Sequence, residues 1–98
     1  MNRHAPTTKV LLIEDDPAVH IALASVLVSE GYEVIHGFDG IDALRAAMAN
    51  DDIAIVLIDL NLPYLSGWDA IEPLTRLRPL VPVVVITARP NQFELASA

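Results

Sequence analysis

Acidic residues stand directly after two apolar segments of this chain, and their type and position indicate a candidate metal-binding or reactive site. The apolar residues 10–13 are followed by Glu14, Asp15 and Asp16, and the apolar residues 53–58 are followed by Asp59. Apolar runs without polar alternation are typical of parallel strands buried on both faces. Because ligand sites in parallel sheets lie beyond the carboxyl ends of the strands, these carboxyl groups are expected to converge at one edge.

A group of carboxylates needs a cation, because carboxylates repel one another and resist desolvation. Mg²⁺ fits this donor set best, since it prefers oxygen ligands. The pattern therefore predicts a Mg²⁺-assisted pocket in which one carboxylate can act as a nucleophile. The alternative is that these acids cap the helices that follow them, and this alternative applies most directly to Asp16, which precedes Pro17.

Composition limits the function classes. The chain has 98 residues, which indicates one domain, and a hydrophobic fraction of 53%, which favours a packed globule. A net charge of −7 argues against direct binding of nucleic acid, and the lack of cysteine excludes disulfides and thiolate metal sites. The sequence has neither a signal region nor an apolar run long enough to span a membrane, so a cytoplasmic domain is expected.

Strand and helix patterns alternate after a polar tail at residues 1–8, and residues 9–98 form the predicted domain. Strands are predicted at residues 9–14, 32–36, 53–58 and 83–86. The first helix is predicted from Pro17 until Gly31 stops it, and the second from Asp39 or Gly40 to about Asn50. A third helix follows the loop at residues 60–66, and Pro73 predicts either a kink or a late start for it. Residues 88–98 resemble a loop and the beginning of another helix.

Each helix carries a predicted apolar stripe, and His20 in the first helix is interpreted as an ordinary surface residue. The stripes comprise Val19, Leu23, Val26 and Leu27 in the first helix, Ile41, Leu44, Ala47 and Met48 in the second, and Trp68, Ile71, Leu74 and Leu77 in the third. The alternation of strands and helices predicts an α/β doubly wound parallel sheet with right-handed crossovers. The expected strand order is 2-1-3-4, with Asp59 and Thr87 projecting from the same edge as the acidic cluster.

Four motifs together make the chain similar to a response-regulator receiver domain of two-component signalling, which has a flavodoxin-like fold. The motifs occur in the family's order at residues 11–17 (LLIEDDP), 38–44 (FDGIDAL), 58–63 (IDLNLP) with Gly67, and 85–89 (VITAR). The resemblance covers the chain from about Lys9 to its end. It implies that a histidine kinase or a histidine phosphotransfer protein transfers a phosphoryl group to an aspartate of this chain.

The resemblance also implies roles for individual residues. It makes Asp59 the phosphoacceptor and Thr87 the switch hydroxyl. Mg²⁺ would be bound by Asp15, by Glu14 through water, by Asp59 and by the backbone carbonyl of Asn61. Asp16 and Arg89 are possible modulators. Arg89 and Asn61 occupy positions that tune the lifetime of the phosphoaspartate in this family.

One departure from the family concerns the C-terminal part. Receivers continue through a fourth helix, a fifth strand that ends in a lysine, and a fifth helix, whereas this chain ends at Ala98 and has Lys9 as its only lysine. The domain is therefore expected to be incomplete, without the fifth strand and fifth helix, and phosphorylation is expected to be weakened. Residues 83–86 would then form an exposed apolar edge that could pair with a second copy of the chain.

The sequence leaves two functions open. The first is a phosphoacceptor domain, which modifies its own aspartate and is not a turnover enzyme. The second is a receiver-like interaction module, or an inactive fragment, that is not phosphorylated. A phosphatase with an aspartate nucleophile is disfavoured, because Asn61 cannot serve as the general acid expected two residues after Asp59.

Overall fold

Strands and helices alternate throughout the part of the chain that the structure describes. The computed structural model describes residues 7–60 and 67–86. Its elements are β1 (Lys9–Ile13), α1 (Pro17–Ser29), β2 (Glu33–Gly37), α2 (Gly40–Ala49), β3 (Ile53–Asp59), α3 (Gly67–Leu77) and β4 (Val83–Ile86). The predicted tail and the predicted start of a fourth helix fall largely or wholly on residues 1–6 and 87–98, outside the described residues.

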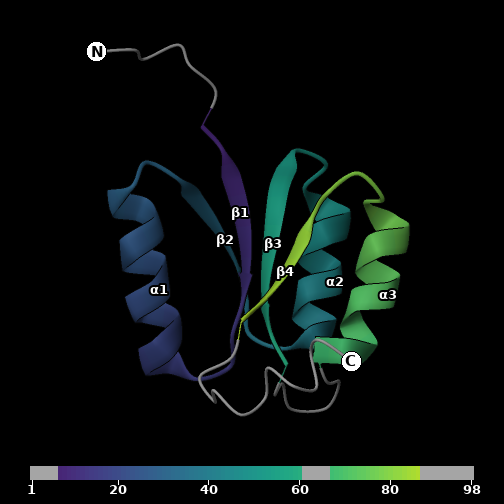
Figure 1. The fold of residues 1–98 in the computed structure, drawn as a ribbon, viewed down its shortest axis with the longest axis horizontal. Helices are drawn as coiled ribbons and strands as arrows, with labels where there is room; N and C mark the ends of the chain where they lie inside the picture. Colours follow the sequence, from purple (N-terminus) through teal and green to yellow (C-terminus); the bar gives the residue numbers. More distant parts are fainter. Residues whose placement is uncertain (1–6, 61–66, 87–98) are drawn as a thin grey trace.

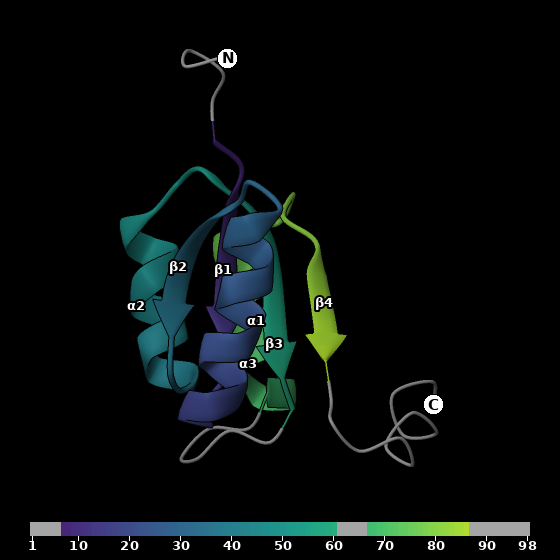
Figure 2. The ribbon, with the colours of Figure 1, turned by 90° about the vertical axis from the view of Figure 1, so that its left-hand side faces the viewer.

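The strands form one parallel sheet in the order β2-β1-β3-β4, which confirms the predicted fold class and strand order. Helix α1 covers one face of the sheet, and α2 and α3 cover the other (Figures 1 and 2). Strand β1 lies in the middle of this arrangement, and residues 10–13 are at most 1% exposed. Leu11 and Ile13 pack in one core cluster with Ala43 and Leu74, from the two helices of the same face. The sheet therefore holds the end of β1 rigidly.

Side-chain caps set the starts of α1 and α2. The Asp16 carboxylate accepts hydrogen bonds from the backbone N–H groups of Ala18 and Val19. At α2, Asp39 accepts from the N–H of Asp42, and the Asp42 carboxylate accepts from the N–H of Phe38. The caps thereby anchor both helices to the loops that follow β1 and β2.

The predicted strand boundaries differ slightly from the observed ones. β1 ends at Ile13 rather than Glu14, β2 lies one residue later than expected, and β3 continues to Asp59. Gly31 follows α1 with a φ of +94°, a conformation that glycine adopts without strain, so the predicted stop of this helix is confirmed.

The predicted apolar stripe of α1 is partly wrong. Val19 and Val26 are 37% and 60% exposed, whereas His20 is only 2% exposed. Helix α1 is apolar around most of its circumference, so periodicity alone could not select its buried face. The sheet covers the face that carries His20, with Leu23 and Leu27 half-buried nearby in the helix.

The predicted stripe of α2 is also partly wrong, although Ala47 is buried and Leu44 packs half-buried against the core as predicted. Ile41 and Met48 are exposed, whereas Ala43 and Ala47 are buried. Ala43 and Ala47 lie in the core cluster, and the small side chain at position 43 allows α2 to lie close to Gly37 at the end of β2.

Helix α3 begins at Gly67 and contains Pro73, so the late start is wrong. Ala70 and Leu74, on either side of Pro73, are 0% and 2% exposed. Proline lacks the N–H for one helical hydrogen bond, and the burial of these neighbours offsets that loss. Among the helices that the structure describes, none is both long and apolar enough to cross a membrane.

Candidate functional site

The register of β1 and β3 sets the geometry of the acidic pocket. Ile13 in β1 pairs with Ile58 in β3, so the next residues, Glu14 and Asp59, lie side by side at the carboxyl edge. Asp15 follows Glu14 in the loop between β1 and α1. Parallel strands therefore bring together residues that are more than forty positions apart in the sequence.

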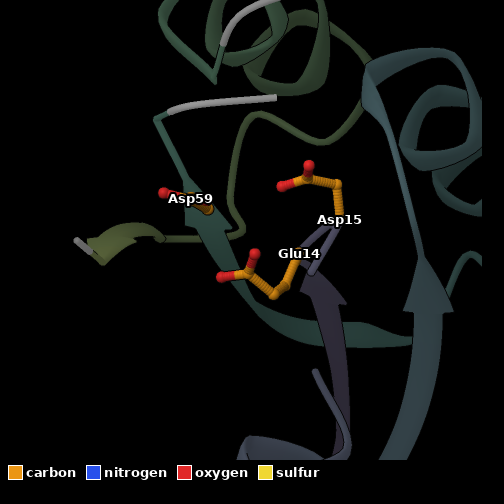
Figure 3. Close-up of side chains that lie close together, drawn as sticks. All are labelled: Glu14, Asp15 and Asp59. Carbon is orange, nitrogen blue, oxygen red and sulfur yellow. The ribbon is translucent and has the colours of Figure 1, made fainter. Parts of the chain in front are cut away.

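Three carboxyl groups of the described residues converge at this edge. Glu14, Asp15 and Asp59 each offer an oxygen atom, and these atoms all lie within 4.8 Å of one another (Figure 3). Glu14 is buried, Asp59 is half-buried and Asp15 is exposed, so the pocket has a closed base and an open side. A ligand can enter from the side of Asp15.

The surroundings of Glu14 shift the pKa of its carboxyl group. The pKa of its carboxyl group is raised from 4.5 to about 7, chiefly by burial and also by the nearby carboxyl groups of Asp59 and Asp15. The backbone N–H of Asp16 donates to Glu14 Oε2 at 3.1 Å and opposes this rise. Without a cation, the pocket thus favours a proton on Glu14.

This arrangement fits Mg²⁺. The three side chains supply only oxygen donors, which Mg²⁺ prefers, and their charges repel one another until a cation or a proton is bound. Glu14, Asp15 and Asp59 are the described residues that would hold the ion. Figure 3 shows that they come from the ends of β1 and β3.

The remaining residues that the sequence singled out lie elsewhere. Asp16 caps α1 and is not a member of the three-carboxyl group. Asn61, Thr87 and Arg89 lie outside the described residues. Ile86, which directly precedes Thr87, pairs with Asp59 across β3 and β4.

Lys9, the only lysine, lies at the opposite end of β1 from the pocket. Its ammonium group forms an ion pair with Asp52 at 2.5 Å. Its pKa is raised, chiefly by a hydrogen bond with the same carboxylate. This agrees with the expectation that Lys9 plays no part in the pocket.

Sequence reasoning missed His20, which it interpreted as a surface residue. Its Nδ1 lies 2.9 Å from the backbone oxygen of Glu14, and its Nε2 lies 2.7 Å from Nδ1 of His36. The ring of Phe38 stacks on the His20 ring with a centroid separation of 4.3 Å. Burial lowers the pKa of His36, and His20 contributes to this shift. Helical spacing from Leu23 and Leu27 was the one sequence signal that could have indicated a buried position for His20.

Comparisons with known proteins agree with this geometry. A family model described as "Response regulator receiver domain" matches residues 10–98. The sensory transduction protein RegX3 of Mycolicibacterium smegmatis is 40% identical over 87 residues, which cover 89% of this chain and 37% of RegX3. The chain thus spans well under half the length of this relative.

Two solved structures at 30% identity are similar throughout the fold. One is the receiver domain of the sensor histidine kinase PA1611 from Pseudomonas aeruginosa PAO1, with a magnesium ion coordinated in its active-site cleft; its TM-score is 0.79, with 95% of this chain and 80% of that chain covered. The other is a response regulator protein from Burkholderia pseudomallei with a phosphorylated aspartic acid, a calcium ion and citrate. Its TM-score is 0.78, and the match covers 84% of this chain and 48% of that chain. From the family match over residues 10–98 and the identity with RegX3, the chain belongs to the response regulator receiver domain family.

Proposed function

We propose that this chain accepts a phosphoryl group on Asp59, with Mg²⁺ bound by the carboxyl groups of Glu14, Asp15 and Asp59. The convergence of the three ligand atoms within 4.8 Å is the observation that supports this function. The magnesium and the phosphorylated aspartate of the two similar structures support it as well.

The proposed reaction is a transfer of one phosphoryl group. A carboxylate oxygen of Asp59 attacks phosphorus, and the P–N bond of a phosphohistidine breaks, with its electron pair going to the donor imidazole. Mg²⁺, when bound, offsets the negative charge on the phosphoryl oxygens. Glu14 and Asp15 keep the ion beside Asp59. The product is an acyl phosphate on this chain, so the domain is modified and does not turn over an external substrate.

The proposed donor is a histidine kinase or a histidine phosphotransfer protein, acting in the cytoplasm. Thr87 is the proposed switch hydroxyl, Asn61 the proposed source of a backbone ligand, and Asp16 and Arg89 the proposed modulators. The net charge of −7 favours protein partners over nucleic acid for this domain.

Phosphorylation with a small donor tests the proposal. The chain is incubated with acetyl phosphate and Mg²⁺, and intact mass spectrometry is expected to detect the addition of one phosphoryl group that hydroxylamine removes. Asp59→Asn is expected to abolish this addition, because an amide is not a competent nucleophile. Asp51→Asn provides the matched control, since Asp51 is exposed in the turn before β3. Labelling that persists in Asp59→Asn would refute Asp59 as the phosphoacceptor. Labelling that never appears in the parent would favour the interaction-module alternative.

A second copy of the chain is a further proposed partner. Within the described sheet, β4 pairs with β3 along one edge, and its four residues are all apolar. An apolar edge strand is a template for another strand. Light scattering over a range of concentrations is expected to detect dimers, and Val84→Lys is expected to weaken them, with Val84→Thr as the control. A monomer at every concentration would refute this pairing.

A further inference from the structure

Two hydrogen bonds fix the main chain of Glu14 from opposite sides. Its N–H donates to the backbone oxygen of Gly37 at the end of β2, with an N–O distance of 3.0 Å. Its carbonyl oxygen lies 2.9 Å from Nδ1 of His20 in α1. The first bond continues the sheet, whereas the second comes from a buried helix side chain that the proposed transfer reaction does not use.

The position of the hydrogen atoms follows from these contacts. A carbonyl oxygen can only accept, so Nδ1 of His20 carries a hydrogen and donates it to Glu14. In neutral His20, Nε2 is then an acceptor, and Nδ1–H of His36 donates to it. Phe38 stacks on the same ring. His36 and Phe38 thus hold the His20 ring in one tautomer and one orientation.

The carbonyl of Glu14 belongs to the peptide group that joins Glu14 to Asp15. A peptide group is planar, so its orientation sets ψ of Glu14 and φ of Asp15 together. These two residues carry two of the three carboxyl groups of the pocket. A hydrogen bond to this one carbonyl therefore helps to hold the backbone between the two residues that carry these side chains.

We propose that His20 is a positioning residue for the metal pocket, which orients the Glu14–Asp15 peptide group through Nδ1 while His36 fixes its tautomer. This inference rests on the proposed function only in taking the pocket as a Mg²⁺ site. His20 touches neither the proposed ion nor the phosphoryl group. Groups of this kind, which orient metal ligands from behind, typically change metal affinity by about 10- to 100-fold when they are removed.

Three variants of His20 separate the hydrogen bond from the packing of the ring. His20→Leu fills a similar volume but has no donor. His20→Asn keeps a donor, because Nδ2 of asparagine is attached to Cγ as Nδ1 of histidine is. His20→Gln places its amide one atom further out, near the position of Nε2, and so does not reproduce this donor.

Mg²⁺ binding to the 98-residue chain is measured by calorimetry, without any phosphoryl donor. Mg²⁺ is expected to bind His20→Leu and His20→Gln about tenfold more weakly than the parent, and His20→Asn close to the parent. Equal affinity in all four proteins would overturn the proposal. An equal loss in all three variants would also overturn it, because the donor at Nδ1 would then not be the cause.

A measurement on the parent chain keeps the proposal testable if the variants do not fold. Nitrogen NMR of the imidazole rings is expected to detect the Nδ1–H tautomer of His20 at neutral pH, with a shift of this signal when Mg²⁺ is added. An Nε2–H tautomer, or a signal that Mg²⁺ leaves unchanged while it binds, would contradict the proposal. A parent that binds no Mg²⁺ would instead refute the metal pocket, and the tautomer would still report separately on the His20–Glu14 contact.

Discussion

Gly37, at the end of β2, lies directly against Ala43 in α2. A Cβ atom at position 37 would be 3.2 Å from the Cα of Ala43 and 3.4 Å from Cγ1 of Ile13. The closest neighbour is helix backbone, which cannot rotate away as a side chain can. The backbone oxygen of Gly37 also accepts the N–H of Glu14, so this close approach is coupled to the base of the pocket.

Gly37→Ala is therefore expected to destabilise the fold by about 1–3 kcal/mol, because overpacking displaces α2 or the end of β2. Urea denaturation measures the free energy of unfolding. Glu33→Ala is a suitable control, since Glu33 is exposed in the same strand and its replacement should change stability by less than about 0.5 kcal/mol. Equal stability of Gly37→Ala and the parent would mean that the contact at position 37 is loose.

Asp16 offers a test that separates capping from metal binding. Asp16→Ala is expected to destabilise the chain by about 1 kcal/mol, because two N–H groups at the start of α1 lose their acceptor. Asp16→Asn keeps an acceptor and should retain the stability of the parent. Calorimetry with Mg²⁺ should give similar affinities for Asp16→Asn and the parent; a large loss of affinity in Asp16→Asn would instead make Asp16 part of the metal site.

The sequence was sufficient to predict the sheet and the acidic pocket, because both depend on strong local signals. The apolar runs identify the strands, and the position of Glu14, Asp15 and Asp59 directly after or at the end of them identifies the edge where they meet. Parallel pairing then leaves little choice about their proximity. The receiver motifs implied the same pocket independently.

The faces of the helices could not be predicted, for a physical reason. Helix α1 has apolar side chains on most sides, so Val19, Val26 and His20 were equally compatible with several orientations. The contact of His20 with the Glu14 carbonyl depends on how α1 lies on β1 and β2. That is a tertiary property, and periodicity within one helix does not contain it.

The raised pKa of Glu14 predicts how stability depends on pH without metal. The folded state binds a proton at Glu14 up to a pH of about 7, whereas the unfolded chain releases it near 4.5. Between these values the folded state holds more protons, so the contribution of Glu14 to stability falls as the pH rises from 4.5 to about 7. Urea denaturation in EDTA at several pH values should detect this contribution as the difference between the parent and Glu14→Gln, which lacks the titrating group. Parallel pH profiles for the two proteins would contradict the raised pKa.

Divalent metal should stabilise the folded chain, because the ion binds the pocket and not the unfolded state. At a Mg²⁺ concentration of 100 times the dissociation constant, the gain is about 2.7 kcal/mol, which corresponds to a rise in melting temperature of about 10 °C or more for a domain of this size. Asp15→Asn is expected to abolish most of this rise, and to melt above the parent in EDTA because one repelling carboxylate is gone. Asp51→Asn, in an exposed turn, should respond to Mg²⁺ as the parent does. A melting temperature that Mg²⁺ leaves unchanged, together with an Asp15→Asn variant no more stable than the parent in EDTA, would rule out a metal pocket formed by these three carboxyl groups.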